Sequence, residues 1–325
     1  MRNHDEGPAV NEKQADAPQK IALMFQGQGS QMVGMGKDLA AEFPVARRTF
    51  EEAGDVLGFD LTAACFEGPA DTLNSTLYCQ PAVLTQSVAA WRVATELGVR
   101  GDLTLGHSLG EYAALVASGA LSFEEALRLV QTRGKATTDV AHRVPGSMAA
   151  LLGATEEQVE RLCSAIGDVW PANYNCPGQI VASGLIKSVD RLLESAKAQG
   201  VKVRRLDVEG AFHSAVMAPA ADRLREALAG VKVSTPSIPF VSATTAAVEA
   251  GTERVKQILT QQLTGPVRFT QAVRASLDMG TTAYVELGPR KTLAGLVRRI
   301  LPDAAVYHFG SVADVPDIRA MVVRA

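Results

Sequence analysis

A short apolar stretch that runs into Gly-x-Ser-x-Gly constrains this chain more than any other feature. Leu103–Gly106 has the apolar character of a buried strand, and residues 111–118 are rich in helix-forming side chains. Glycines 106 and 110 leave room for a sharp turn between them, so we expect Ser108 at a strained, exposed apex. The free N–H groups that open the following helix would face an anion formed there. The pattern therefore predicts a serine nucleophile at the edge of a sheet.

Composition narrows the class of protein. The 325 residues are 47% hydrophobic, which is enough for one large α/β domain or for two domains. The formal net charge is −3 with acidic and basic residues interspersed, so we expect no nucleic-acid partner. No apolar run is long enough to cross a bilayer, so we expect no membrane association. Residues 1–19 are polar and lack an apolar segment, which predicts a disordered N-terminal tail and not a signal peptide.

The four cysteines argue against a metal site. They form no C-x-x-C pair, and no histidine stands at a ligand-like spacing from any of them. Free thiols in a chain without a secretion signal fit a reducing compartment, so we expect a cytoplasmic protein with each cysteine in the core. We also expect a monomer. The cysteines are Cys65, Cys79, Cys163 and Cys176.

Apolar runs separated by amphipathic segments predict a parallel sheet covered by helices. Ile21–Phe25 is typical of a buried strand and opens into a glycine-rich loop at residues 26–31. This loop lacks the glycine spacing and the later acidic residue of a dinucleotide-binding fingerprint, so we expect it to bind another ligand at the carboxyl edge of the sheet. A helix is predicted over residues 81–97, with the proline in its first turn. Ser122 and Glu125 form a capping box that begins the next predicted helix.

The pattern changes after residue 144. From residue 146 to residue 208 the expected order is strand, helix, strand, strand, helix, strand, which is the ferredoxin-like arrangement. We therefore predict an α/β protein with a small ferredoxin-like (βαββαβ) domain, residues 145–210, inserted in a large domain with a parallel sheet. The large domain would comprise residues 20–144 and 211–312, and residues 313–325 would form a C-terminal tail.

A serine nucleophile needs a base, and His213 is the best placed of the five histidines. It lies where the small domain is expected to rejoin the large one, and such a junction forms the wall of a cleft. No aspartate has a distinctive context as the histidine's acidic partner. A dyad in which a backbone carbonyl holds the imidazole therefore also remains open. The candidate acids are Asp139, Asp168, Asp190 and Asp207.

Several motifs occur in one order between residues 21 and 309. They are QGQGSQ (26–31), QPA (80–82), GHSLGEY (106–112), RGK (133–135), NYNCPGQ (173–179), GAFH (210–213), QL (262–263) and ELGP (286–289). Together they resemble the malonyl-CoA:acyl carrier protein transacylases and the acyltransferase domains of polyketide synthases. The resemblance implies an α/β-hydrolase-like large domain with a ferredoxin-like insert. One departure is Ser242-Ala243, where many members carry asparagine in one or both positions.

The same resemblance assigns an activity and the residues that perform it. A malonyl group would pass from malonyl-CoA to the phosphopantetheine thiol of an acyl carrier protein, for fatty acid or polyketide synthesis, through a seryl enzyme on Ser108. His213 would act as general base and then as acid toward the leaving thiol. The backbone N–H groups of Gln28 and Leu109 would form the oxyanion hole. The main-chain carbonyl of Gln262 would hold the histidine.

Substrate and partner recognition follow from the resemblance as well. Arg133 would pair bidentately with the free carboxylate of the substrate. Phe212 is expected to crowd a 2-methyl group, so malonyl should be preferred over methylmalonyl. Malonyl-CoA is the expected substrate, and no bound cofactor is expected. The expected partner is an acyl carrier protein; because such proteins are usually acidic, we expect docking near the cleft through the basic residues Lys202, Arg298 and Arg299.

Two other classes of function remain open on the sequence. An acyl-thioester hydrolase would use the same serine, histidine and oxyanion hole but give the acyl group to water. A docking module without activity is disfavoured because Ser108 and His213 are intact. Arg133 favours a carboxylated acyl group, since a buried cation is costly unless it meets an anion. The pathway served and the tolerance for other extender units are left open.

Overall fold

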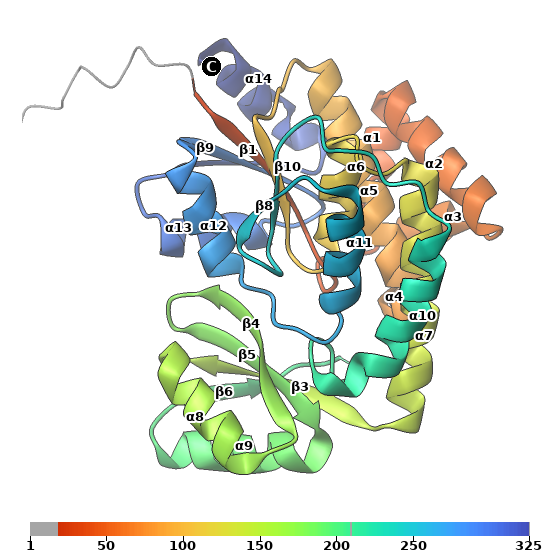
Figure 1. Ribbon diagram of the computed structural model, residues 1–325. Helices are drawn as coiled ribbons and strands as arrows, with labels where there is room; N and C mark the ends of the chain where they lie inside the picture. The colour runs from red at the N-terminus through yellow and green to blue at the C-terminus, as the bar shows by residue number, and fades with distance from the viewer. Residues whose placement is uncertain (1–18, 209, 325) are drawn as a thin grey trace, which may run out of the picture.

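The protein is built on two β-sheets, one above the other in Figure 1. The structure is a computed structural model that describes residues 19–208 and 210–324. The disordered tail expected over residues 1–19 lies outside the described residues, apart from Gln19. Six strands form the upper sheet and four form the lower one.

The six-stranded sheet is almost entirely parallel, as the apolar runs predicted. Only its edge pair, β7 and β8, is antiparallel. Met24 lies opposite Leu105 on one side and Glu286 on the other, so β1, β2 and β9 end level with one another. The loops after these strands therefore meet at one edge, where doubly wound sheets bind ligands. In sheet order the strands are β10 (Ala305–Phe309), β9 (Ala283–Leu287), β1 (Ile21–Phe25), β2 (Leu103–Gly106), β7 (Phe240–Ser242) and β8 (Ala247–Glu249).

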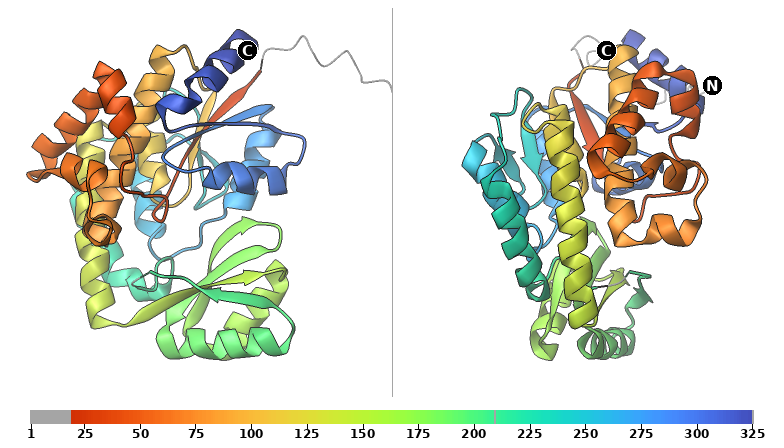
Figure 2. Two further views of the ribbon diagram at one scale, coloured as in Figure 1. Left: turned by 180° about the vertical axis from the view of Figure 1, so that it is seen from behind. Right: turned by 90° about the vertical axis from the view of Figure 1, so that its right-hand side faces the viewer.

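Helices cover both faces of this sheet (Figure 2) because successive side chains of β1 point to opposite faces. Leu23 and Phe25 belong to the larger core, and Ala22 and Met24 belong to a second core under α12 and α13. The helices are α1 (Lys37–Glu42), α2 (Pro44–Leu57), α3 (Leu61–Phe66), α4 (Ala70–Asn74), α5 (Thr76–Glu96), α6 (Gly110–Ala117), α7 (Phe123–Arg143), α10 (Ala218–Ala229), α11 (Thr252–Gln261), α12 (Phe269–Asp278), α13 (Thr292–Ile300) and α14 (Val315–Arg324).

The four-stranded sheet is antiparallel and has the order β4-β5-β3-β6. Two helices cover one face of it, and Leu151, Val159 and Leu192 are buried between the layers. The chain forms these elements in the strand and helix order expected from the sequence. They are β3 (Gly146–Leu152), α8 (Glu156–Ile166), β4 (Val169–Cys176), β5 (Gln179–Leu185), α9 (Ile186–Ala198) and β6 (Lys202–Arg205).

Two expectations about local structure are wrong. Residues 313–325 were expected to form a C-terminal tail, but the described part of this segment, up to residue 324, ends a short 3-10 turn and forms helix α14, with Ile318 and Met321 buried in the large core. The helix expected to begin at Pro81 begins at Thr76 and carries the proline inside it. Packing overrides the local rule here, because the first turn of α5 lies against Gly134 of α7.

Among residues 19–208 and 210–324, no helix is both long and apolar enough to cross a membrane. The same stretches contain no group of three or more metal-ligating side chains placed to hold an ion. The four cysteines are free and buried, as the sequence predicted.

Candidate active site

The Gly-x-Ser-x-Gly stretch forms the sharp strand-to-helix turn that the sequence predicted. Strand β2 ends at Gly106, helix α6 begins at Gly110, and Ser108 between them adopts a left-handed backbone conformation with φ of 52°. A Cβ on Gly106 would collide with the backbone of Gly110, and one on Gly110 would collide with the carbonyl of Phe25. The turn can therefore be this tight only with glycine at both positions.

His213 lies beside the serine. Its Nε2 is 2.7 Å from Oγ of Ser108, and its own backbone is left-handed with φ of 59°. Nδ1 contacts the main-chain carbonyls of Gln262 at 2.8 Å and Gly265 at 3.2 Å. Because a carbonyl can only accept, Nδ1 carries the proton and Nε2 is free to accept the serine hydroxyl.

Among residues 19–208 and 210–324 no carboxylate contacts this histidine, and backbone carbonyls hold its Nδ1 instead. Asp139 pairs with Arg223 and Asp190 pairs with Arg205 at exposed sites. Burial, and after it the nearby Arg133 cation, lower the pKa of His213 to about 3. The imidazole is therefore neutral at physiological pH and can act as a base.

Arg133 brings a buried cation to the same place. It projects from α7 with only 2% of its surface exposed. One guanidinium nitrogen contacts Oγ of Ser108 at 3.2 Å and Oε1 of Gln262 at 3.3 Å, while its Nε has no partner in the described part of the chain. None of the ion pairs between described residues includes Arg133, and burial lowers its pKa. A buried guanidinium without an anion is an unsatisfied charge.

Two polar groups that the sequence analysis missed complete the site. The carboxylate of Glu111, which is fully buried in the first turn of α6, accepts from Nε2 of Gln262 at 2.5 Å. It also accepts from Oγ of Ser242 at 2.8 Å and from the backbone N–H of Ala243 at 2.6 Å. Ser242, which stands where many family members carry asparagine, therefore serves as a hydrogen-bond donor to Glu111. A charged residue in an otherwise apolar helix was the signal that could have revealed this group.

The expected oxyanion donors come from two turns at the carboxyl edge of the six-stranded sheet. Leu109 follows Ser108 as the first residue of the turn into α6, and Gln28 lies in the loop after β1. Within the described residues, neither backbone N–H meets a protein acceptor. The Gln28 loop borders two hollows, one of about 160 Å³ that also contacts His107 and Asn175, and one of about 470 Å³ that reaches Thr76.

The remaining predicted residues lie further out. Phe212 is buried against Met148, Ala150, Ala172 and Val181, on the face of the four-stranded sheet opposite helices α8 and α9. Because it adjoins His213 in the chain, its packing there helps to fix the backbone beside the imidazole. The side chain is thus a packing residue as well as a neighbour of the site.

The three basic residues expected to dock a carrier protein do not form one cluster. Arg299 contacts the carbonyl of Pro177 and the side chain of Gln179 in the β4–β5 turn, each at 3.1 Å. Lys202 is exposed at the same end of this sheet, opposite Leu152. Arg298 instead donates to the carbonyl of Val306 on β10 and lines a hollow beside α14. The structure thus brings Lys202 and Arg299 to one region and directs Arg298 to another.

The family model, the sequence relatives and the solved structures that match this chain are all acyl transferases. Residues 23–318 match the model of the acyl transferase domain family. The malonyl CoA-acyl carrier protein transacylase of Bacillus subtilis strain 168 is 42% identical over 286 residues, which cover 86% of this chain and 90% of the relative. A solved transacylase of the same name from Xanthomonas oryzae pv. oryzae is 40% identical, with a TM-score of 0.91 over 94% of this chain and 98% of the other.

A third match is a malonyl-transacylase solved in complex with a type II polyketide synthase acyl-carrier protein. It is 39% identical and has a TM-score of 0.89 over 93% of this chain and 99% of that one. Family model, sequence relatives and solved structures all agree with the resemblance drawn from the motifs. The chain therefore belongs to the acyl transferase family and, within it, to the malonyl CoA-acyl carrier protein transacylases.

Proposed function

We propose that this protein transfers a malonyl group from malonyl-CoA to the phosphopantetheine thiol of an acyl carrier protein. One observation carries the proposal: the buried guanidinium of Arg133, which forms an ion pair with none of the described residues, lies 3.2 Å from the hydroxyl of Ser108, which itself contacts His213. A substrate that presents a thioester carbonyl to the serine and a carboxylate to the arginine satisfies both groups at once. Malonyl-CoA has this chemistry, and the names of the relatives agree with it.

In the first half-reaction, Oγ of Ser108 attacks the thioester carbonyl while Nε2 of His213 takes the hydroxyl proton. The carbonyl oxygen becomes an anion, which the backbone N–H groups of Gln28 and Leu109 stabilise. The C–S bond then breaks, and the imidazolium gives its proton to the departing sulfur of coenzyme A. The products are free coenzyme A and a malonyl ester on Ser108.

The second half-reaction reverses these steps with a new thiol. The phosphopantetheine sulfur attacks the ester carbonyl while His213 takes the thiol proton, and the proton returns to Oγ of Ser108 as the C–O bond breaks. Support for an acyl carrier protein as the acceptor comes from the related malonyl-transacylase solved with such a partner. We propose Lys202 and Arg299 as part of the docking surface because both are exposed at one end of the four-stranded sheet.

We propose that the chain needs no bound cofactor, because nucleophile, base and oxyanion donors all belong to it. The division into domains is also a proposal. The order β4-β5-β3-β6 with two helices on one face supports a ferredoxin-like insert over residues 145–210, and the parallel sheet supports an α/β-hydrolase-like large domain. The burial of α14 against the large core extends that domain to residue 324. Buried free cysteines support the cytoplasm as its compartment.

The direct test is the mass of the intact protein after mixing with malonyl-CoA. The wild type should gain one malonyl group and pass it to a carrier protein, and Ser108→Ala should gain none. Ser118→Ala is the matched control, because this buried serine directly follows helix α6 and its hydroxyl donates to the carbonyl of Leu115 in the same helix, away from the site. An adduct on Ser108→Ala at the wild-type yield would reject the nucleophile. Release of the acyl group to water, with the carrier protein left unloaded, would support the hydrolase.

A further inference from the structure

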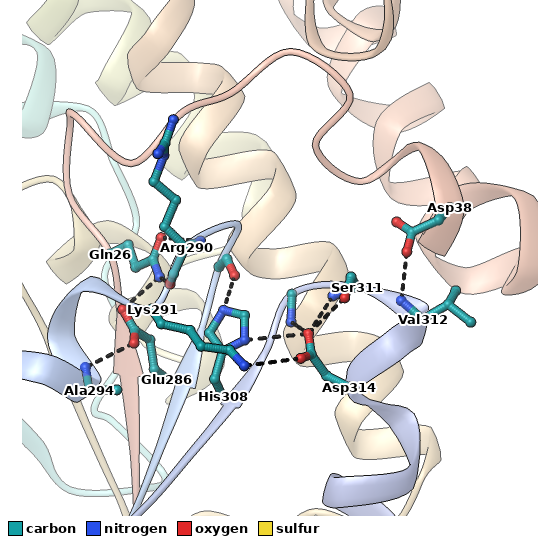
Figure 3. Close-up of polar contacts among 12 residues, drawn as sticks. Gln26, Asp38, Glu286, Arg290, Lys291, Ala294, His308, Ser311, Val312 and Asp314 are labelled. Carbon is teal, nitrogen blue, oxygen red and sulfur yellow. Dashed lines mark hydrogen bonds and ion pairs between the residues drawn. The ribbon is translucent and has the colours of Figure 1, made fainter.

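The loop that carries Gln28 is held from behind by side chains that play no part in the reaction as described so far. Gln26 opens this loop directly after β1, and Glu286 lies near the end of the neighbouring strand β9 (Figure 3). Arg290 follows in the turn between β9 and α13. All three lie at the sheet edge where the site is built.

Gln26 is fixed at both ends of its amide. Its Nε2 donates to Oε1 of Glu286 at 2.6 Å and also to the carbonyl of Arg290. Its Oε1 accepts from the backbone N–H of Arg290 at 3.3 Å. Gln26 is 1% exposed and Glu286 is fully buried. The amide therefore has no freedom to rotate and no water to exchange with.

Glu286 is fixed in turn by a helix. Its Oε1 accepts from the backbone N–H groups of Thr292 at 3.0 Å and Leu293 at 2.6 Å, and its Oε2 accepts from that of Ala294 at 2.9 Å. These are the otherwise unpaired donors at the start of α13, where the helix dipole favours a negative charge. A rigid nine-residue helix therefore determines where the carboxylate lies, and the carboxylate determines where Gln26 lies.

Arg290 holds the far end of the same loop. Its guanidinium donates to the carbonyl of Ser30 at 3.2 Å and to that of Gln31 at 3.4 Å. The hydroxyl of Ser30 donates to the carbonyl of Gly27 at 2.7 Å, which closes the loop on itself. Gln28 lies between these two attachments, so its backbone N–H has little room to move.

The turn that holds the loop allows this contact only because it contains Gly288. A Cβ at that position would lie 2.6 Å from Cδ of Gln26, which is closer than any side chain tolerates. The carbonyl of Gly288 contacts Nε2 of His308 at 2.9 Å, and Nδ1 of that ring lies 3.3 Å from the carboxylate of Asp314 (Figure 3). The turn is thus supported by the C-terminal segment.

We propose that Glu286 and Arg290 are positioning residues of the reaction, which hold the backbone N–H of Gln28 at the oxyanion through Gln26 and Ser30. The inference rests on the proposed function, because it presumes an oxyanion at this loop. A donor stabilises the transition state only when it is already in place at about 3 Å from the developing charge. Two hydrogen bonds from the Gln26 side chain attach the start of the loop to Glu286 and to the carbonyl of Arg290. Two more, from the Arg290 side chain, attach the end of the loop through the carbonyls of Ser30 and Gln31. With both ends fixed, the donor is already in place before the reaction begins.

The test is single-turnover acylation by malonyl-CoA, followed by rapid quenching and intact mass. Gln26→Met keeps the side-chain length and removes every hydrogen bond of the amide. We expect the limiting acylation rate to fall by about 10–100-fold, which is less than the loss of a whole oxyanion donor. The half-saturating malonyl-CoA concentration and the malonyl-to-acetyl preference should stay within about twofold, because the donor acts on the transition state alone.

Gln86→Met is the matched control. Gln86 is also a fully buried glutamine that donates to one backbone carbonyl, that of Gly310, but it does not touch the loop. This variant should lose stability and keep its acylation rate. Arg290→Met changes an exposed side chain and so keeps the fold, and it should slow acylation by about 3–10-fold.

The outcomes separate the inference from the proposed function. Wild-type acylation rates in Gln26→Met and Arg290→Met would overturn the inference and leave the proposed function intact. So would an equal loss in Gln86→Met, which would reduce the effect to general stability. If Gln26→Met does not fold, the rate of Arg290→Met decides. Absence of any adduct on the wild type would overturn both.

Discussion

Gln262 donates its side-chain amide to the buried carboxylate of Glu111 at 2.5 Å. The same glutamine gives its main-chain carbonyl to Nδ1 of His213 and its side-chain oxygen to Arg133. Its amide also donates to the carbonyl of Ser108 at 3.0 Å. The carboxylate of Glu111 thus helps to orient His213, Arg133 and Ser108 through a single intermediate residue, Gln262. The histidine is held by backbone, yet its position still depends on an acid.

Glu111→Gln should therefore weaken both the fold and the reaction. The new amide places an N–H donor where Gln262 or Ser242 already donates, so one buried donor loses its partner. We expect the free energy of unfolding to fall by about 1–3 kcal/mol and the acylation rate to fall with it. Urea unfolding and single-turnover acylation measure the two effects. Ser242→Ala removes one donor to Glu111 and leaves the others, so its losses of stability and of acylation rate should be smaller. Full activity in folded Glu111→Gln would contradict the proposed role of Glu111 in orienting Gln262.

Arg133 should decide between carboxylated and neutral acyl groups. Malonyl supplies an anion for the buried guanidinium, whereas acetyl leaves it unpaired. We expect the malonyl-to-acetyl ratio of kcat/KM to fall by about 10–100-fold in Arg133→Ala, as befits a charged hydrogen bond of about 1.5–3 kcal/mol. Arg133→Lys should recover part of it, because an ammonium lacks the fork. An unchanged ratio in Arg133→Ala would return the hydrolase to consideration.

The lowered pKa of His213 predicts how stability depends on pH. The folded histidine has a pKa of about 3, and a histidine in the unfolded chain has one of about 6.5. Between these values only the unfolded chain binds the proton, so the free energy of unfolding should fall with decreasing pH by up to about 1.4 kcal/mol per unit. Above about pH 6.5 the contribution is constant.

The comparison that isolates this effect is wild type against His213→Gln, by urea unfolding at several pH values. His107 has a lowered pKa as well, because it is buried, but it is present in both proteins. As the pH falls, the free energy of unfolding should decrease more steeply in the wild type than in His213→Gln, and the difference in slope should correspond to the uptake of up to one proton on unfolding. Parallel pH profiles would mean that His213 binds its proton equally well in the folded and unfolded chain, so that folding does not lower its pKa.

Phe212 should disfavour a branched acyl group. Replacing it should also destabilise the fold. The wild type should favour malonyl over methylmalonyl by about 1–3 kcal/mol in kcat/KM. Because Phe212 packs against Met148 and its neighbours, Phe212→Ala should destabilise the protein by about 3–5 kcal/mol. Phe212→Leu keeps more of the volume and is the better test of selectivity. Its ratio of malonyl to methylmalonyl should decrease, and an unchanged ratio would place the selectivity elsewhere.

Arg299 should contribute more to carrier docking than its neighbour Arg298. Lys202→Glu and Arg299→Glu are each expected to raise the KM for the carrier protein by about 2–5-fold and to leave acylation by malonyl-CoA unchanged. Arg298→Glu, whose side chain faces β10, should change it less. The differences should shrink as salt is added. Equal effects of the two arginines would show that docking extends over the whole end of α13.

The sequence was most informative where a few adjacent residues determine the geometry. The turn around Ser108 depends on two glycines and two flanking elements, so a local pattern was enough to predict it. Side-chain partners between distant segments were out of reach. The contact of Gln26 with Glu286 depends on the register of β1 and β9, which no local pattern records.

Expectations also failed where packing outweighs composition. The last residues of the chain resemble an exposed tail, yet Ile318 and Met321 are buried because α14 covers an open side of the core. Pro81 suggested the start of a helix that in fact begins a full turn earlier, where α7 offers a surface to pack on. Docking through Lys202, Arg298 and Arg299 stays a prediction. It was inferred from charge, which does not say in which direction a side chain points, and Arg298 and Arg299 contact different segments.

The pairing of β1 with β9 has a consequence for how the protein is made. Gln26 and Glu286 are separated by 260 positions in the chain, so a ribosome releases the serine and the histidine well before the strand that secures the loop beside them. During synthesis the unfinished chain lacks β9, which pairs with β1, and helix α13, whose first N–H groups hold Glu286. The loop beside Ser108 therefore cannot reach its final arrangement before β9 has been made, and a polypeptide truncated before residue 283 should be inert although it contains Ser108 and His213.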